Sequence, residues 1–119
     1  MKNIEVNLEP GDVVLLSFPG TKQTKVRPAV ILSSRMYNRV RPDLILGLVT
    51  SQINAARGPT DHFLQDWSQA QLTRPSAFRA YFATLPRSAV RLRVGKLTDR
   101  DWRGVQEKTK LAFGFTRDH

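Results

Sequence analysis

Short apolar segments of strand length recur along the first half of this chain. They cover residues 13–18, 29–32 and 44–49, and turns that contain proline or glycine, such as residues 10–12, punctuate them. Runs of Val, Ile, Leu and Phe bounded by turn residues are typical of β-strands. We therefore expect these three segments in the core of a mostly antiparallel, strongly curved sheet.

The second half predicts two more strands and a helix. Residues 76–85 and 89–95 alternate apolar residues with small, polar or basic ones, the pattern of a strand with one buried face. Residues 98–101 resemble a capping box with Asp in place of Glu or Gln, which predicts the start of a helix. Its buried face would hold Trp102, Val105, Thr109 and Ala112. Gly114 is a natural helix stop.

Three stretches predict their local structure less clearly. Residues 35–43 contain three arginines and Tyr37, and we interpret them as a basic turn that either contacts a nucleic-acid backbone or is simply solvated. Residues 62–64 predict a short strand. Residues 66–72 predict either a turn of helix or a loop that packs Trp67.

Length and charge narrow the class of protein. A chain of 119 residues suits one domain, so we expect a single domain over residues 1–119. The net charge of +9 favours a partner that is nucleic acid, an acidic protein or an anionic membrane. No apolar run approaches the ~20 residues that span a bilayer, and the first residues lack an apolar export signal. We therefore expect a cytoplasmic protein that does not enter a membrane.

Several kinds of chemistry are missing from the sequence. The chain has no cysteine, which excludes disulfides, thiolate metal sites and a cysteine nucleophile. It lacks a phosphate-binding loop, a glycine-rich dinucleotide motif and a His-Glu-x-x-His helix. Its 10 acidic residues are scattered, which argues against a two-metal site, so we expect no metal and no cofactor. The remaining set of Arg, hydroxyl, His and Tyr side chains suits RNA cleavage by the RNA's own 2′-hydroxyl, where the protein orients the chain and stabilises charge on phosphorus.

Arg27 is the first candidate for a functional side chain. It precedes Pro28, whose ring fixes its own φ and pushes Arg27 toward an extended backbone at the mouth of a buried strand. A guanidinium held in this way can bind two phosphate oxygens with its planar fork. The alternative is an arginine that closes the end of a strand in a surface ion pair.

Further polar candidates lie in the segments between the predicted strands. Lys22 and Lys25 belong to the loop of residues 19–25, which we interpret either as a flap that closes on a phosphate chain or as an ordinary solvated loop. Three hydroxyl or amide side chains stand where the third strand leaves the core: Thr50, Ser51 and Gln52. They either bind a ligand or bond the nearby backbone in a turn. Arg57 follows them in the next loop.

The opening of the chain reads Pro-Gly-Asp-Val-Val-Leu, then Phe-Pro, then Arg-Pro-Ala-Val-Ile-Leu-Ser, and the later segments include Val-Thr-Ser-Gln and Arg-Pro-Ser-Ala-Phe-Arg-Ala. In order and spacing, these motifs resemble the MazF/PemK family of toxin endoribonucleases. The matching segments are residues 10–15, 18–19, 27–33, 49–52, 74–80 and 95–99, the last followed by the helix. Together they extend over about residues 10–113.

The resemblance implies a small, barrel-like sheet of the SH3 type with a C-terminal helix, usually as a homodimer. It implies a toxin of a type II toxin–antitoxin system that cleaves single-stranded RNA, usually mRNA, at specific sequences without a metal, and that a cognate acidic antitoxin neutralises. The family's strand-mouth arginine corresponds to Arg27, its core-strand threonine to Thr50, and a second catalytic arginine of some members to Arg79. The side chains that we expect to bind RNA around them are Lys22, Lys25, Ser51, Gln52, Arg57 and Tyr81.

The chain departs from the family pattern in two places. Tyr81 stands where an Arg-x-Asp motif has its Asp, and the loop of residues 20–26 contains no Glu or His. The general base of some members is therefore missing, and Tyr81, His62 or a water molecule are the candidates to replace it. The alternatives are slow or absent cleavage, a nucleic-acid-binding module that keeps the fold without the chemistry, and a toxin that inhibits DNA gyrase, as a related fold does.

Overall fold

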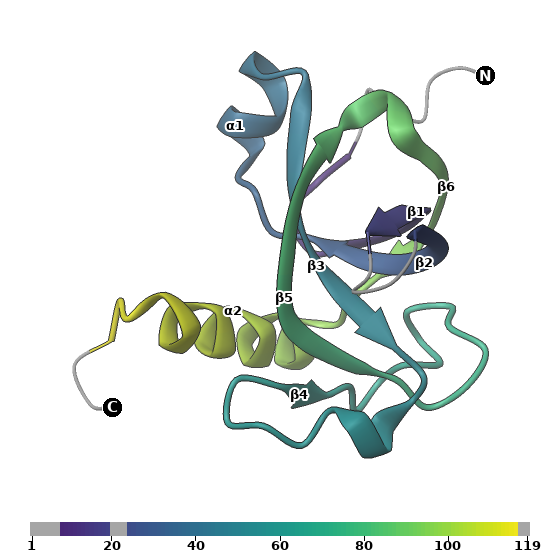
Figure 1. Cartoon of the computed structure of the whole chain (residues 1–119), viewed down its shortest axis with the longest axis vertical. Coiled ribbons are helices and arrows are strands. Elements are labelled where there is room, and N and C mark those ends of the chain that lie inside the picture. Colours follow the sequence, from purple (N-terminus) through teal and green to yellow (C-terminus); the bar gives the residue numbers. More distant parts are fainter. Residues whose placement is uncertain (1–7, 20–23, 117–119) are drawn as a thin grey trace.

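The computed structural model describes residues 8–19 and 24–116. Within these ranges the chain forms six β-strands and two α-helices (Figure 1). In chain order they are β1 (Asp12–Pro19), β2 (Thr24–Ile31), α1 (Arg35–Val40), β3 (Asp43–Thr50), β4 (His62–Phe63), β5 (Ala77–Pro86), β6 (Val90–Lys96) and α2 (Asp99–Phe113). Two short 3₁₀ turns lie at Ile53–Ala55 and Arg87–Ala89. No helix in the described ranges has both the length and the apolar character needed to cross a bilayer.

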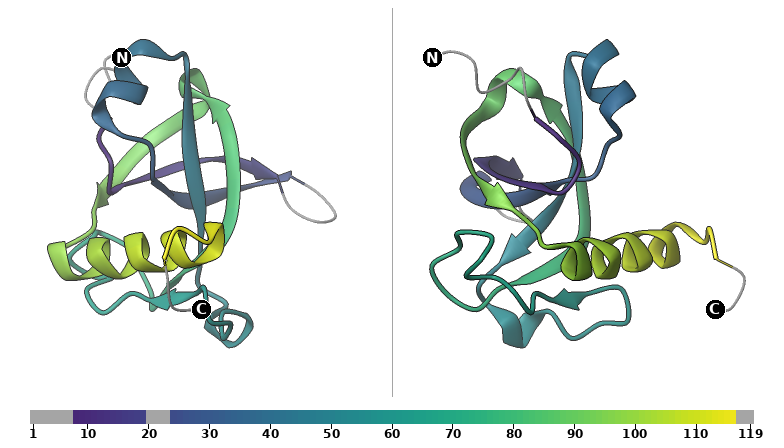
Figure 2. Two further views of the ribbon diagram at one scale, coloured as in Figure 1. Left: turned by 90° about the vertical axis from the view of Figure 1, so that its left-hand side faces the viewer. Right: turned by 180° about the vertical axis from the view of Figure 1, so that it is seen from behind.

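The six strands form one sheet in the order β4-β5-β3-β2-β1-β6, and each neighbouring pair is antiparallel. The sheet bends strongly, since β1 and β2 run across the direction of β3 and β5 in the left view of Figure 2. Helix α2 packs beside β4 and β5 (Figure 1). These features confirm the mainly β, antiparallel and curved fold with a C-terminal helix that the sequence predicts.

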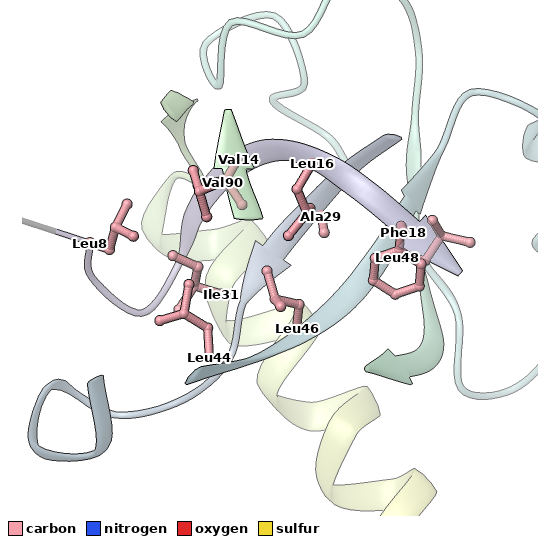
Figure 3. Packing of buried hydrophobic residues seen from close by; sticks show 10 residues of the cluster. All are labelled: Leu8, Val14, Leu16, Phe18, Ala29, Ile31, Leu44, Leu46, Leu48 and Val90. Carbon is pink, nitrogen blue, oxygen red and sulfur yellow. The ribbon is translucent and has the colours of Figure 1, made fainter. Parts of the chain in front are cut away.

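The central strands are buried on both faces, which explains their continuous apolar runs. From β1, Val14 and Leu16 point into one hydrophobic cluster, together with residues of β2, β3 and β6 (Figure 3). Val13, which precedes Val14, points to the opposite face, into a second cluster that includes Phe78 of β5 and Val105 of α2. The sheet is therefore held from both sides, and the ends of its central strands are fixed in position.

Residues 35–43 are not the basic turn that the sequence predicts. Helix α1 starts after Ser34, whose Oγ accepts a hydrogen bond from the backbone N–H of Tyr37 at 3.1 Å. A serine cap ahead of a run without Gly or Pro is a helix-start signal, and it outweighs the turn interpretation. Two arginines of this region are engaged in ion pairs with neighbouring carboxylates: Arg35 with Glu9 and Arg41 with Asp43.

Helix α2 begins after Thr98 as predicted, but the capping box is wrong. Oγ1 of Thr98 donates a hydrogen bond to Asp66 at 2.6 Å instead of accepting one from the helix backbone. Asp101 is fully buried and accepts hydrogen bonds from the backbone N–H groups of Gln65 and Asp66, and its Oδ1 lies 3.0 Å from Nε2 of His62. Both side chains therefore tie α2 to the segment after β4 rather than capping the helix.

The segment of residues 66–72 forms turns rather than helix, and Trp67 packs against the second cluster, as the loop alternative predicts. On the predicted buried face of α2, Val105 is fully buried, whereas Ala112 in the last turn is exposed. Phe113 stacks on Phe82 instead, with ring centroids 4.9 Å apart. Helix α2 ends at the predicted Gly114, which adopts a left-handed conformation (φ 74°).

Strand β6 does not keep the regular alternation that its sequence predicts. Leu92 is exposed, because the pairing of β6 with β1 contains two register shifts that break the simple period of two. Arg93 turns back toward the sheet, and its Nε lies 3.1 Å from a carboxylate oxygen of the fully buried Asp12. This arginine is therefore committed to the fold rather than to a basic outer face.

Candidate active-site cleft

The main cleft opens where β2 and β3 stop pairing. Their ladder ends with Ala29 opposite Leu48, and the preceding residue of β2, Pro28, has no N–H to offer to a neighbouring strand. Arg27 of β2 and Thr50 of β3 each lie two residues beyond this last pair. The two strands thus carry both side chains to a cleft of about 370 Å³. Its lining comprises residues 25–28, residues 48–52, Ala55 and Arg79.

Arg27 lies half-buried in the main cleft, and its Nε has no partner among the described residues. This nitrogen is screened from solvent, and no described residue accepts a hydrogen bond from it. A buried donor without an acceptor costs roughly 1–3 kcal/mol and is uncommon in native proteins. The geometry therefore disfavours the surface ion pair that was the alternative for Arg27, and it leaves the guanidinium available to an anion in the cleft.

Thr50 ends β3 at the floor of the cleft. Its Oγ1 accepts a hydrogen bond from the backbone N–H of Gln52 at 3.0 Å, which fixes the side chain in a local turn. The hydroxyl hydrogen remains free to donate, because a hydroxyl can accept and donate at the same time. The turn interpretation of Thr50 is therefore confirmed, and its binding of a ligand stays a prediction. Ser51 and Gln52 extend the lining toward an adjoining hollow of about 500 Å³ formed by residues 51–55.

Arg79 approaches the cleft from β5, on the other side of β3. It pairs with Leu48, and the register shifts between Leu48 and Gly47, which pairs with Phe82. Ala80 and Tyr81 are thus extra residues in a bulge, a feature that redirects side chains and is common next to functional sites. Arg79 lines the main cleft and also a second hollow of about 390 Å³, here called the Tyr81 hollow. That hollow is formed by Gly58, Thr60, Asp61, Arg79, Ala80 and Tyr81.

A comparison with known protein families shows to which of them this chain belongs. The model of the PemK-like, MazF-like toxin of type II toxin–antitoxin systems matches residues 9–113, which is most of the sequence. The chain belongs to this toxin family. The resemblance that the sequence motifs indicate is thereby confirmed.

Individual relatives agree with the family assignment. The endoribonuclease MazF of Staphylococcus saprophyticus is 27% identical over 108 residues, which cover 87% of this chain and 89% of that protein. Among solved structures, a mycobacterial endoribonuclease in complex with its cognate antitoxin matches with a TM-score of 0.77 at 18% identity, covering 92% of this chain and 98% of that one. MazF from Deinococcus radiodurans matches with a TM-score of 0.72 at 23% identity, covering 89% and 96%. The two structural matches establish a shared fold.

The structure brings most of the predicted site of this MazF-like chain together. Six of the predicted residues line the main cleft: Lys25, Arg27, Thr50, Ser51, Gln52 and Arg79. Lys25 does so from β2, paired with Phe18, so its predicted place in the loop is wrong. Lys22 lies outside the described residues, and its role stays a prediction.

Two predicted RNA contacts lie beside the main cleft rather than in it. Tyr81 is in the Tyr81 hollow, next to Arg79. Arg57 lines a third hollow of about 380 Å³ together with Lys108 of α2. His62, a candidate for proton transfer, also borders this third hollow, but its Nε2 is directed at the buried Asp101. His62 is thus outside the main cleft.

Asp61 is the residue at the site that sequence reasoning missed. Its Oδ1 lies 3.7 Å from Nε of Arg79, although the two residues belong to different strand regions. No local motif marks it, and only the pairing of β4 with β5 brings it to Arg79. Within the described part of the chain, no group of three or more His, Cys, Asp or Glu side chains is arranged to hold a metal ion.

Proposed function

We propose that this MazF-like chain is a metal-independent endoribonuclease toxin that cleaves single-stranded RNA, in the cell mRNA, at specific sequences. Family membership supports the toxin role, and the Staphylococcus relative is named as an endoribonuclease. The observation that carries the proposal is the buried Nε of Arg27, which has no acceptor among the described residues, in a cleft that Thr50, Lys25 and Arg79 also line. Such a cleft suits a phosphodiester, whose oxygens are negatively charged acceptors.

The reaction that fits this set of side chains is attack by the RNA's own 2′-hydroxyl. Its oxygen bonds to the adjacent phosphorus, the bond from phosphorus to the 5′-oxygen breaks, and the proton lost by the 2′-hydroxyl is matched by one gained by the leaving oxygen. The products are a 2′,3′-cyclic phosphate and a 5′-hydroxyl. Negative charge grows on the phosphoryl oxygens along the way. Arg27 stabilises that charge from β2, Arg79 does so from β5, and Thr50 donates its hydroxyl hydrogen.

The hollows next to the main cleft form a series that suits a single strand. Ser51 and Gln52 connect the main cleft to the hollow of residues 51–55, and Arg79 connects it to the Tyr81 hollow. Tyr81 is 38% exposed and held by an edge-on contact with Phe18, so its ring is available to stack on a base. In this proposal Arg57 and Lys108 bind phosphates beyond the Tyr81 hollow. A duplex keeps its bases stacked and paired, whereas a single strand can place them in separate hollows.

The proposal includes a neutralising partner. A chain with a net charge of +9 and a basic cleft suits an acidic antitoxin segment whose carboxylates occupy the RNA path. Solved structures of family members include a mycobacterial endoribonuclease with its cognate antitoxin and a MazE–MazF complex from Deinococcus radiodurans. We place the toxin in the cytoplasm as a homodimer, where mRNA and a co-expressed antitoxin are both present.

The test is cleavage of a labelled single-stranded RNA by purified protein in the presence of EDTA. We expect fragments that carry a 2′,3′-cyclic phosphate and a 5′-hydroxyl, and chelation should leave the rate unchanged. RNA that is bound but stays intact would instead support a binding module without the chemistry. Intact RNA together with altered DNA supercoiling in a gyrase assay would favour a gyrase inhibitor.

A further inference from the structure

One carboxylate of the described residues lies beside the basic cleft. Among the described residues that line the main cleft and the Tyr81 hollow, Asp61 is the acidic one. Its Oδ1 lies 3.7 Å from Nε of Arg79, and the exposed fractions of the two side chains are 7% and 40%. The carboxylate is therefore covered, while the arginine beside it reaches the surface where a substrate would bind.

The fold fixes Asp61 in this place from several directions. In the β4–β5 ladder His62 pairs with Phe78, so the next position outward sets Asp61 against Arg79. The other carboxylate oxygen, Oδ2, accepts a hydrogen bond from the backbone N–H of Gly58 at 2.9 Å, and the N–H of Asp61 donates to the carbonyl of Gly58 at 3.1 Å. Its neighbour His62 is anchored to the buried Asp101 of α2. Asp61 is thus preorganised by strand pairing, a turn and the helix.

The contact engages the part of Arg79 that a phosphate does not need. Asp61 faces Nε, which leaves the two terminal nitrogens for the oxygens of an anion. An ion pair with a partly exposed arginine adds little to stability, so the main effect of Asp61 is on where the guanidinium points. Because the carboxylate is almost fully covered and already bonded to Gly58, it does not present a bare negative charge to an incoming phosphate.

We propose that Asp61 is the positioning residue for Arg79: it holds the guanidinium at the junction of the main cleft and the Tyr81 hollow, with its terminal nitrogens directed to the scissile phosphate. This assignment rests on the proposed function for its consequence in catalysis. The holding of Arg79 itself is a property of the free protein and can be measured without any RNA.

The first experiment measures the order of the Arg79 side chain by NMR relaxation of its Nε–H group in ¹⁵N-labelled protein. We expect Arg79 to be more ordered than the exposed Arg103 of α2, and to fall to the level of Arg103 in Asp61→Asn. This variant keeps the shape and the acceptor for Gly58 but loses the charge. Asp43→Asn is the matched control. It removes the charge of another aspartate that pairs with an arginine, Arg41, at the end of β3 that lies away from the cleft. An Arg79 signal that is unchanged in Asp61→Asn overturns the assignment.

The second experiment is a double-mutant cycle on single-turnover RNA cleavage. Asp61→Asn should slow cleavage by about tenfold, equivalent to ~1.4 kcal/mol, and should add nothing in an Arg79→Ala background. A rate loss of the same size with and without Arg79 overturns the assignment, because it would show that Asp61 acts elsewhere. If the wild-type protein leaves RNA intact, the proposed function fails, whereas the NMR measurement still decides whether Asp61 holds Arg79.

Discussion

At the scale of single residues, the proposed chemistry depends most directly on the guanidinium of Arg27. Its Nε is buried and has no partner in the described part of the chain, so the folded protein gains little from it and bears a desolvation cost. We expect Arg27→Ala to lower single-turnover cleavage by roughly 10²–10³-fold, the range for losing one preorganised charge stabiliser, while the melting temperature stays level or rises. Arg27→Lys should restore only part of the rate, because an ammonium lacks the planar fork. Quench-flow and thermal melts on the same samples provide both measurements.

A matched control for this prediction is Arg103→Ala on the exposed face of α2, which removes one positive charge away from the cleft. It should cleave at the wild-type rate. Binding of an uncleavable RNA should weaken only modestly in Arg27→Ala, because the other basic residues still contact the backbone. A folded Arg27→Ala protein that cleaves normally would contradict the role, and so would a large drop in melting temperature with the activity of the folded fraction intact.

At the scale of elements, the contact between β4 and α2 depends on a glycine in the helix. A Cβ on Gly104 would overlap the ring of His62, which is bonded to the buried Asp101. Alanine normally favours a helix by about 1 kcal/mol over glycine, but overpacking costs about 1–3 kcal/mol and the His62–Asp101 bond would be lost as well. We therefore expect Gly104→Ala to lower the free energy of unfolding, as denaturant titration would measure. In a His62→Ala background, which makes room for the methyl group, the same substitution should become stabilising. A stabilised single mutant would show that His62 moves away at no cost.

Contacts of the same helix also make the stability of the fold depend on pH in the acid range. Hydrogen bonds from Arg100, and to a smaller extent from Thr98, lower the pKa of Asp66 from 3.8 to about 2. Because the pKa is lower in the folded state, this carboxylate stabilises the fold above about pH 3.8, and the contribution is lost as the pH falls toward 2. Asp66→Asn should lower the melting temperature at neutral pH and flatten its decline over that acidic interval. Glu107→Gln, an exposed change on α2, should keep the wild-type decline. Parallel curves for the wild type and Asp66→Asn would refute the linkage.

For the whole molecule, the arrangement of cleft and hollows predicts which RNA is cut. A single deoxyribose at the cleaved position should abolish cleavage and leave binding nearly intact, because the nucleophile is removed and the phosphates remain. A complementary strand should protect the site, since an A-form duplex holds the 2′-hydroxyl away from in-line geometry. Gel analysis of matched oligonucleotides measures both effects. Cleavage of the deoxyribose-containing strand at an unchanged rate would rule out 2′-hydroxyl attack.

Net charge sets a second expectation at this scale. With +9 charges on 119 residues, binding of RNA and of an acidic antitoxin peptide should both weaken as salt rises, through released counterions and screened ion pairs. The peptide should compete with RNA for the main cleft. Fluorescence anisotropy across a salt series measures these affinities. An antitoxin affinity that does not change with salt would indicate an apolar interface instead.

Sequence patterns and the family resemblance predict the class of fold and the six polar side chains that line the main cleft. Continuous apolar runs predict strands buried on both faces, and the fixed φ of Pro28 identifies the stretch that carries Arg27. These signals are local, because they depend on the chemistry of neighbouring residues. Where local signals compete, the sequence pattern is misleading: residues 35–43 predict a basic turn although Ser34 caps a helix there, and Thr98 and Asp101 predict a capping box although each bonds the segment after β4.

Which residues come together depends instead on the pairing of strands far apart in the sequence. Arg27 and Thr50 line one cleft because each lies two residues beyond the last pair of the β2–β3 ladder. Arg79 reaches the same cleft through a bulge in β5, and Asp61 joins it through the short pairing of β4 with β5. Strand register follows from the packing of whole faces and from turns far along the chain, so no short motif contains it. For this reason the cationic members of the site were predictable one by one, whereas the carboxylate beside Arg79 was not.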